Sequence, residues 1–120
     1  MANTIEKKSL NVPEETRTFD KGKLEIVKLE KGVIGRATFE PGWRWSECVK
    51  PIAKTQSCQT AHFGYVVAGR MKVVMDDGKE AEYGPGDAMS IAPGHDAWIV
   101  GNEACVCIDV TGAEHYAERT

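Results

Sequence analysis

Two histidines and two cysteines are the strongest candidates for metal chemistry in this sequence: His62, His95, Cys48 and Cys58. Imidazole nitrogens and thiolate sulfurs form a soft ligand set, which favours zinc or copper over manganese. We predict that the two histidines share a single divalent ion with one of the two thiolates. The cysteines form no CxxC pair, so the zinc-ribbon and thioredoxin spacings are absent.

Spacing bears on which cysteine joins the histidines. If Cys58 and His62 lie on one regular strand, their Cα atoms are about 13 Å apart, too far for both to reach an ion at roughly 2.0–2.3 Å. Cys58 therefore contributes only if the chain bends between them, whereas Cys48 comes from a different segment. A cysteine nucleophile with His62 as its base is another arrangement, but the sequence assigns no third group to orient the histidine.

The other two cysteines and the third histidine have plain structural interpretations. Cys105 and Cys107 are separated by one residue, so both thiols face the same side of a strand, where they act as small core residues. His115 lies in the polar C-terminal tail, and we expect it in solvent.

Aromatic and polar side chains close in sequence to the candidate ligands are predicted to line a pocket: Trp43, Trp45, Glu47, Gln56, Asp96 and Trp98. Burial in the core is the alternative for each indole, and solvent exposure is the alternative for Glu47. Asp96 either orients the ring of His95 through its N–H or accepts backbone hydrogen bonds in a turn.

Residues 61–98 organise the predicted fold, because the two histidines lie near its ends. Asp77-Gly78 predicts a two-residue hairpin turn within this block. Gly or Pro separates four short runs rich in Val, Ile, Met or aromatic residues, which is typical of antiparallel strands: 62–68, 71–75, 79–83 and 88–92.

The flanking parts of the chain supply further strands at 23–30, 33–40, 97–101 and 104–110. Residues 1–20 are predicted to form an extended arm with one short strand at most. Residues 48–59 show no alternation and contain Pro51, so we predict a loop there. The C-terminal tail has the length for one helical turn but no apolar stripe to dock it. About eight short strands with frequent turns indicate an all-β barrel or double-sheet jelly roll.

Composition limits the classes of partner. With 120 residues, 42% hydrophobic and 28% charged, the chain has the size and balance of one globular domain. A net charge of −3 argues against nucleic acid, whose phosphates need a basic surface. No apolar run reaches the ~20 residues of a membrane span, and the N-terminus lacks the apolar core of a signal peptide. We therefore expect a cytoplasmic protein in reducing surroundings.

The order of glycines, prolines and histidines resembles the cupin superfamily, whose small β-barrels carry two short motifs. After Pro41-Gly42, Cys48-Val49-Lys50 stands in the place of the first motif's His-x-His. Gln56-Ser57-Cys58 is the alternative counterpart, with the shorter spacing to His62, which itself stands in the place of a glutamate. In the second motif, Ala97 and Gly101 stand in the places of the histidine and the asparagine. The run PGHDAW at 93–98 resembles a subtype of small single-domain cupins.

The resemblance implies a cupin-type double-stranded β-helix, a jelly-roll barrel, as one domain over residues 1–120 with its core at about 23–110. It also implies one divalent ion, from among zinc, iron, nickel and copper, in a site that departs from the usual three histidines and a glutamate. The implied function is a metal-dependent oxygenase, isomerase or lyase on a small polar metabolite, in a homodimer. The alternatives are a metal-free ligand-binding or sensing module and a structural dimer unit without catalysis.

Overall fold

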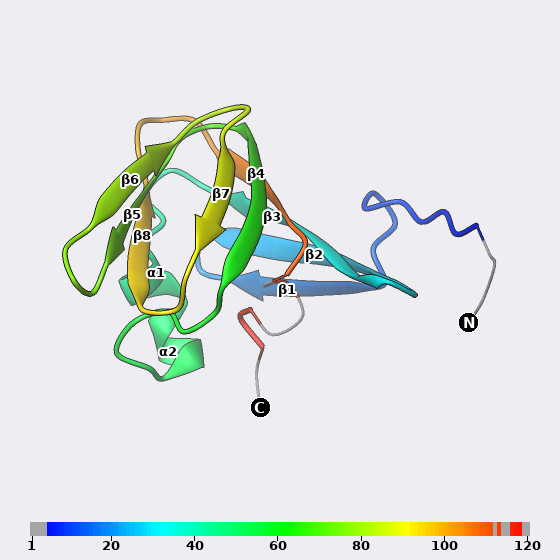
Figure 1. Cartoon of the computed structure of the whole chain (residues 1–120), viewed down its shortest axis with the longest axis horizontal. Coiled ribbons are helices and arrows are strands. Elements are labelled where there is room, and N and C mark those ends of the chain that lie inside the picture. The colour runs from blue at the N-terminus through cyan, green and yellow to red at the C-terminus, as the bar shows by residue number, and fades with distance from the viewer. Residues whose placement is uncertain (1–4, 112, 114–115, 119–120) are drawn as a thin grey trace.

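The computed structural model describes residues 5–111, 113 and 116–118. Strands dominate these residues, which confirms the all-β prediction (Figure 1). The elements, in chain order, are β1 (Glu15–Phe19), β2 (Gly22–Leu29), β3 (Gly32–Phe39), α1 (Trp45–Cys48), α2 (Lys50–Ala53), β4 (His62–Ala68), β5 (Met71–Met75), β6 (Glu80–Tyr83), β7 (Ala88–Ile91), β8 (His95–Ile99) and β9 (Cys105–Asp109).

The strands form two antiparallel sheets around one core. The larger sheet has the order β1-β2-β3-β9-β4-β7, and the smaller has the order β6-β5-β8. Apolar side chains from both sheets belong to the same buried cluster, such as Leu24 and Val66 from the larger and Val73 and Ala97 from the smaller. The arrangement is a double-sheet jelly roll whose interior is lined by alternate residues of each strand.

β4 shows this alternation most clearly. His62 and Val66 face inward, while Phe63, Tyr65 and Val67 are exposed on the outer face. The strand lies between β9 and β7 in the larger sheet, and His62 is directly opposite Ile91 of β7. The strand is therefore paired on both sides, and the inward-facing histidine is fixed at its first residue by pairing with β7.

The strand predicted at 97–101 begins two residues earlier, at His95, and ends at Ile99. Gly94 before it has φ +96°, a left-handed conformation that glycine adopts without strain. The turn therefore ends sooner than expected, and His95 pairs with Met75 in the ladder. His95 and Ala97 are both buried, as residues two apart on one strand face should be.

The hairpin between β5 and β6 differs in detail from the predicted two-residue turn. The amide of Gly78 donates to the carbonyl of Met75 (2.9 Å), and the amide of Met75 donates to the carbonyl of Lys79 (2.7 Å). The loop thus contains three residues, Asp76, Asp77 and Gly78, of which Gly78 alone has a positive φ, at +95°. A turn closed by a left-handed glycine is the usual form of a three-residue hairpin.

The predicted loop at 48–59 contains the last residue of one single-turn helix, α1, and all of a second one, α2. Pro51 lies in the first turn of α2, where a missing amide hydrogen costs nothing, and Lys54 ends the helix in a left-handed conformation. Four residues are too few to show a helical period, so the pattern in the sequence gave no sign of them.

The described residues of the C-terminal segment are docked, contrary to the expectation of an unanchored tail. Ala113, Tyr116 and Ala117 are all buried. The guanidinium of Arg17 donates to the carbonyls of Ala113 (3.1 Å) and Tyr116 (2.9 Å), and the Tyr116 ring packs edge-on against Phe19. Single apolar residues and hydrogen bonds to backbone carbonyls anchor this segment, as an apolar stripe would anchor a longer helix. His115 lies outside the described residues.

Candidate metal centre

One thiol and two imidazoles converge inside the barrel. A ligand atom from each of Cys58, His62 and His95 lies within 4.8 Å of the other two. The sulfur of Cys58 is 3.8 Å from Nε2 of His62, and the two imidazole rings are 5.3 Å apart at 67°. Cys58 and His95 are only 2% and 3% exposed. The structure therefore assembles a compact set of donors at a place that water barely reaches.

A bend in the chain brings Cys58 into this group. Its amide donates to the carbonyl of His95 (2.7 Å), and its carbonyl accepts from the amide of Gly94 (2.7 Å), which forms an isolated bridge between the two segments. The chain then turns before β4 begins at His62. The large separation expected for a regular strand does not apply, because Cys58 and His62 are not on one strand.

Each histidine has its Nδ1 atom engaged by a neighbour. Nδ1 of His62 is 2.5 Å from a carboxylate oxygen of Asp109, and Nδ1 of His95 is 2.9 Å from the carbonyl of Ala92. Carboxylates and carbonyls accept hydrogen bonds, so both Nδ1 atoms carry the hydrogen and Nε2 is the atom left for a ligand. Hydrogen bonds of this kind fix the tautomer and ring orientation of histidines that bind metals.

Electrostatics favours a thiolate at Cys58. Burial alone raises the thiol pKa, but hydrogen bonds and charge from His62 and His95 outweigh it and bring the pKa down from 9.0 to about 6. Burial likewise lowers the pKa of His62, yet Asp109 and Cys58 together raise it from 6.5 to about 9. At neutral pH the metal-free site thus holds a thiolate, an imidazolium and a carboxylate in a row.

Two cavities meet at this group. The inner one, of about 40 Å³, lies in the barrel and is lined by His62, His95 and Asp109 together with apolar and aromatic residues from both sheets. The second, of about 210 Å³, is bordered by α1, α2 and the C-terminal segment, and Cys58 lines it. Trp45 and Tyr116 line both, so these two rings form the wall between them.

The other predicted site residues fall in three places. Trp43 and Trp45 are buried and line the inner cavity. Glu47 and Gln56 are exposed and line neither cavity. Asp96 and Trp98 lie outside both cavities: Asp96 accepts from the amides of Ser46 (3.1 Å) and Ala97 (2.9 Å), and Trp98 packs under the Arg44 guanidinium at 4.3 Å.

Cys48 lies apart from the group of Cys58, His62 and His95. Its sulfur is 3.7 Å from a carboxylate oxygen of Asp20, and no histidine contacts it among the described residues. Of the two cysteines left open by the sequence, only Cys58 is brought to the histidines.

Asp109 and Tyr116 are site residues that the sequence did not reveal. Asp109 follows Cys105 and Cys107 at the same two-residue spacing on β9, so a carboxylate on an otherwise apolar strand face was the available signal. The ring of Tyr116 packs edge-on against His62 at 5.4 Å. No periodic pattern marks Tyr116, because the segment around it is not part of a regular element.

The fold and this group of residues define a small barrel protein with a candidate metal centre in its interior. Residues 36–111, more than half of the chain, match the model of the cupin domain, so this chain belongs to the cupin family. No curated protein matches it. In the part of the chain that the structure describes, no helix has the length and apolar character to cross a membrane.

Several solved structures share the fold. A sugar phosphate isomerase of the cupin superfamily from Silicibacter pomeroyi aligns with a TM-score of 0.62 and 19% identity, over 88% of this chain and 74% of that one. A protein of unknown function from Rhizobium leguminosarum bv. viciae aligns with a TM-score of 0.59 and 17% identity, over 90% of this chain and 96% of that one. A variant of Bacillus subtilis oxalate decarboxylase aligns with a TM-score of 0.56 and 19% identity, over 80% of this chain but only 27% of that one. This chain therefore spans about a quarter of the decarboxylase, and at these identities the likeness concerns the fold alone.

Proposed function

We propose that this cupin is a metal-dependent enzyme for a small molecule, with Cys58, His62 and His95 as the protein ligands of one divalent ion. The observation that carries the proposal is the engagement of both Nδ1 atoms, by Asp109 and by Ala92, which leaves two Nε2 atoms and one sulfur to converge. Two imidazoles and a thiolate suit zinc or copper, and three protein ligands leave a position open for water or substrate.

Charge supports the fit of a divalent ion. The Cys58 thiolate and the Asp109 carboxylate supply two negative charges, which balance the ion once His62 has given up its Nε2 proton. When bound, the ion supplies Lewis acidity and activates water. The chain's own residues do the rest: Asp109 holds the ring of His62, the carbonyl of Ala92 holds the ring of His95, and the apolar barrel keeps bulk water out.

The reaction class that we propose is the one expected from the sequence, an oxygenase, isomerase or lyase acting on a small metabolite. The cavity of about 40 Å³ supports a small substrate, because a water molecule needs roughly 10–15 Å³ measured in this way. The activities of the structural neighbours do not define this one, since identities below 20% leave the site residues free to differ.

Metal analysis of untagged protein tests the proposal. We expect about one zinc or copper per chain by plasma mass spectrometry after purification, or after dialysis against the metal, and loss of that metal in His62→Ala. The Cys48→Ala variant is the matched control, because it removes a buried thiol outside the group and should keep the metal. A wild-type protein that holds no stoichiometric metal after dialysis would refute the proposal.

A second candidate function is favoured by one observation, the alignment of Cys58, His62 and Asp109. The sequence offered no third group for a cysteine nucleophile, and Asp109 is that group. The Cys58 thiolate would attack an ester carbonyl, the alcohol would leave with the proton of His62, and water would hydrolyse the thioester to the acid and the free thiol. A burst of product from p-nitrophenyl acetate with metal-free protein, absent in Cys58→Ala, supports this reading; no burst contradicts it.

We propose a homodimer formed through the outer face of β4. Phe63 is 58% exposed, and Tyr65, Val67 and Val110 are exposed around it, an apolar strip of the kind that marks interaction surfaces. Light scattering should give twice the chain mass for the wild type and the single mass for Phe63→Lys, with Val12→Lys, an exposed apolar site elsewhere, as the control. A monomeric wild type would contradict the proposal.

We also propose a cytoplasmic location. All four cysteines are free, including Cys105 and Cys107, whose sulfurs are 3.8 Å apart. Thiols this close stay unpaired in a reducing compartment. Fractionation of cells should place the protein in the soluble cytoplasmic fraction, and recovery outside it would contradict the proposal.

A further inference from the structure

The indole nitrogen of Trp43 is a buried donor that lacks an acceptor. Trp43 is 2% exposed, and its Nε1 has no hydrogen-bond partner among the described residues. It is the only fully enclosed side-chain nitrogen or oxygen in that part of the chain without a partner. An unpaired N–H in an apolar interior is costly, so its presence calls for an acceptor that comes from outside the chain.

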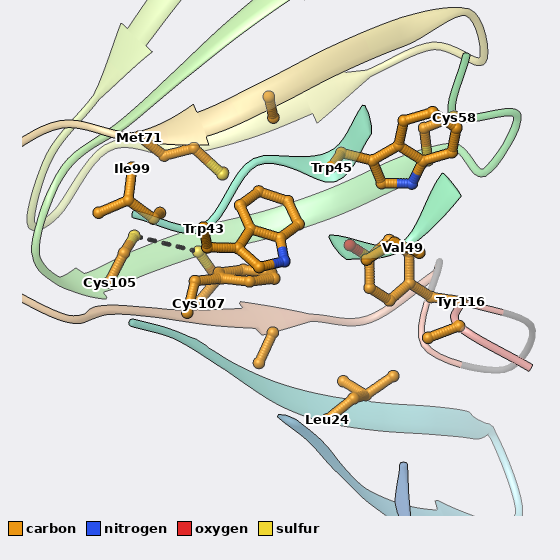
Figure 2. Packing of buried hydrophobic residues seen from close by; sticks show 14 of the residues in the cluster. Leu24, Trp43, Trp45, Val49, Cys58, Met71, Ile99, Cys105, Cys107 and Tyr116 are labelled. Atoms are coloured by element: carbon orange, nitrogen blue, oxygen red, sulfur yellow. Dashed lines mark hydrogen bonds between the residues drawn. The ribbon is translucent and has the colours of Figure 1, made fainter. Parts of the chain in front are cut away.

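The position of Trp43 ties this donor to the candidate metal centre. Trp43 lines the same inner cavity as His62 and His95. Figure 2 shows the nitrogen on the side of the indole that faces Tyr116, with the hydroxyl of Tyr116 pointing back toward Trp43. The phenolic O–H of Tyr116 is a second hydrogen-bond donor on this side of the cavity. A carbonyl oxygen, with two lone pairs, has the capacity to accept from both.

The lining of the cavity restricts the charge of the ligand. No lysine or arginine lines it among the described residues, and Asp109 is acidic. A divalent ion held by Cys58 beside Asp109 would be neutralised by these two groups, so it leaves no excess positive charge for an anion. The remaining wall is apolar, for example Leu24, Met89 and Ile91. An anion would pay a large desolvation cost here, because no positive charge compensates it. A neutral molecule has a much smaller desolvation cost.

The size of the cavity restricts the ligand further. About 40 Å³ accommodates roughly three water-sized groups. An alcohol of this size would bring a hydroxyl hydrogen that needs an acceptor, but the Asp109 oxygens are already engaged by His62 and by the amide of Thr111 (3.0 Å). A carbonyl compound brings only an acceptor, which is what Trp43 lacks.

We propose that the inner cavity binds a small uncharged carbonyl compound whose oxygen accepts a hydrogen bond from Nε1–H of Trp43. This substrate class rests on the proposed function, because the metal centre in the same cavity is what would act on the bound molecule. Trp43 is thereby assigned as a substrate-orienting residue, a more specific role than the pocket lining that the sequence offered as one of two alternatives for each indole.

Three probes of equal heavy-atom count test the proposal: acetone, 2-propanol and acetate. The chain has three tryptophans, so the ¹⁵N–¹H spectrum of zinc-loaded protein should contain three indole signals, which Trp→Phe variants at positions 43, 45 and 98 assign. We expect acetone to move the Trp43 signal downfield and to saturate in the millimolar range. The Trp98 signal, from an indole outside the cavity, should stay in place.

The outcomes separate this inference from the proposed function. If acetate or 2-propanol moves the Trp43 signal as far as acetone does, the neutral-carbonyl class is wrong; if no probe moves it, the donor serves no ligand of this kind. Both results overturn the inference while the zinc content, measured on the same sample, still supports the metal centre. Trp43→Phe should abolish the acetone-dependent rise in Tm and retain zinc, and Trp98→Phe should retain both. Two of the three variants are enough to assign all three indole signals, so misfolding of one variant leaves the test on the wild-type protein intact.

Discussion

Cys48 and Cys58 are two buried thiols ten positions apart with opposite chemistry. Their exposed fractions are 4% and 2%, so the solvent exposure of the two side chains does not distinguish them. Burial and the nearby Asp20 raise the pKa of Cys48, whereas His62 and His95 lower the pKa of Cys58 to about 6 in spite of burial. The neighbouring charge, and not the depth of the residue, decides whether a buried cysteine is a core residue or a reactive one.

The largest expected difference between the two cysteines is in metal affinity. Cys58→Ala removes a ligand, so we expect zinc affinity to fall by more than the about 10- to 100-fold that loss of an outer hydrogen-bond partner costs. Cys48→Ala should leave zinc affinity unchanged, because Cys48 contacts Asp20 and not the histidines. Competition with a chromophoric chelator measures the zinc affinity of each variant. Equal losses of affinity in the two variants would contradict the prediction that only Cys58 binds the ion.

Alkylation of the metal-free protein should show the next largest difference. At pH 7 a thiol of pKa about 6 is roughly 90% thiolate, while a thiol whose pKa exceeds 9.0 is about 1% thiolate or less. A thiolate of lower pKa is the weaker nucleophile, so Cys58 should react severalfold, and not on the order of 100-fold, faster with iodoacetamide. The Cys58 rate should level off above about pH 7, and the Cys48 rate should keep rising. Peptide mapping by mass spectrometry assigns the sites, and zinc should protect Cys58 alone.

The pH dependence of zinc binding sharpens the same contrast. Between pH 7 and 9 Cys58 is already a thiolate, but His62, with its pKa raised to about 9, must lose a proton before Nε2 binds the ion. Affinity should therefore rise about tenfold per pH unit in this range and level off above it. Calorimetry in buffers of different ionisation enthalpy counts the released proton. A pH-independent affinity would show that Asp109 does not hold His62 in its charged form.

The smallest expected effect is on stability. Cys48→Ala removes one buried sulfur near the core and should lower the free energy of unfolding by about 1 kcal/mol, with the two-state transition retained. Urea denaturation of zinc-free protein measures it. A loss several times larger would mean that Cys48 does more than fill space at the end of α1.

Much of the fold follows from local patterns, whereas the site depends on contacts that no local pattern encodes. Alternation located the strands on either side of His62, because their buried faces repeat every second residue. The bend at Cys58 depends instead on its pairing with His95, 37 positions away, so the sequence left both cysteines open and raised its spacing objection against Cys58. Asp109 meets His62 only because β9 pairs with β4. Single-turn helices and isolated anchors such as Tyr116 are too short to show a period.

The backbone bridge between Cys58 and His95 has a thermodynamic consequence. The two segments that carry these ligands are held together by their own hydrogen bonds, and the ring of His62 is held by Asp109. The donors are thus preorganised, and capture of an ion has little conformational entropy left to remove. A zinc finger is the opposite case, because it folds only when it binds the ion. If the protein binds the ion that we propose, a chelator should therefore remove the ion without unfolding the barrel, and the protein would exchange metal as a folded molecule.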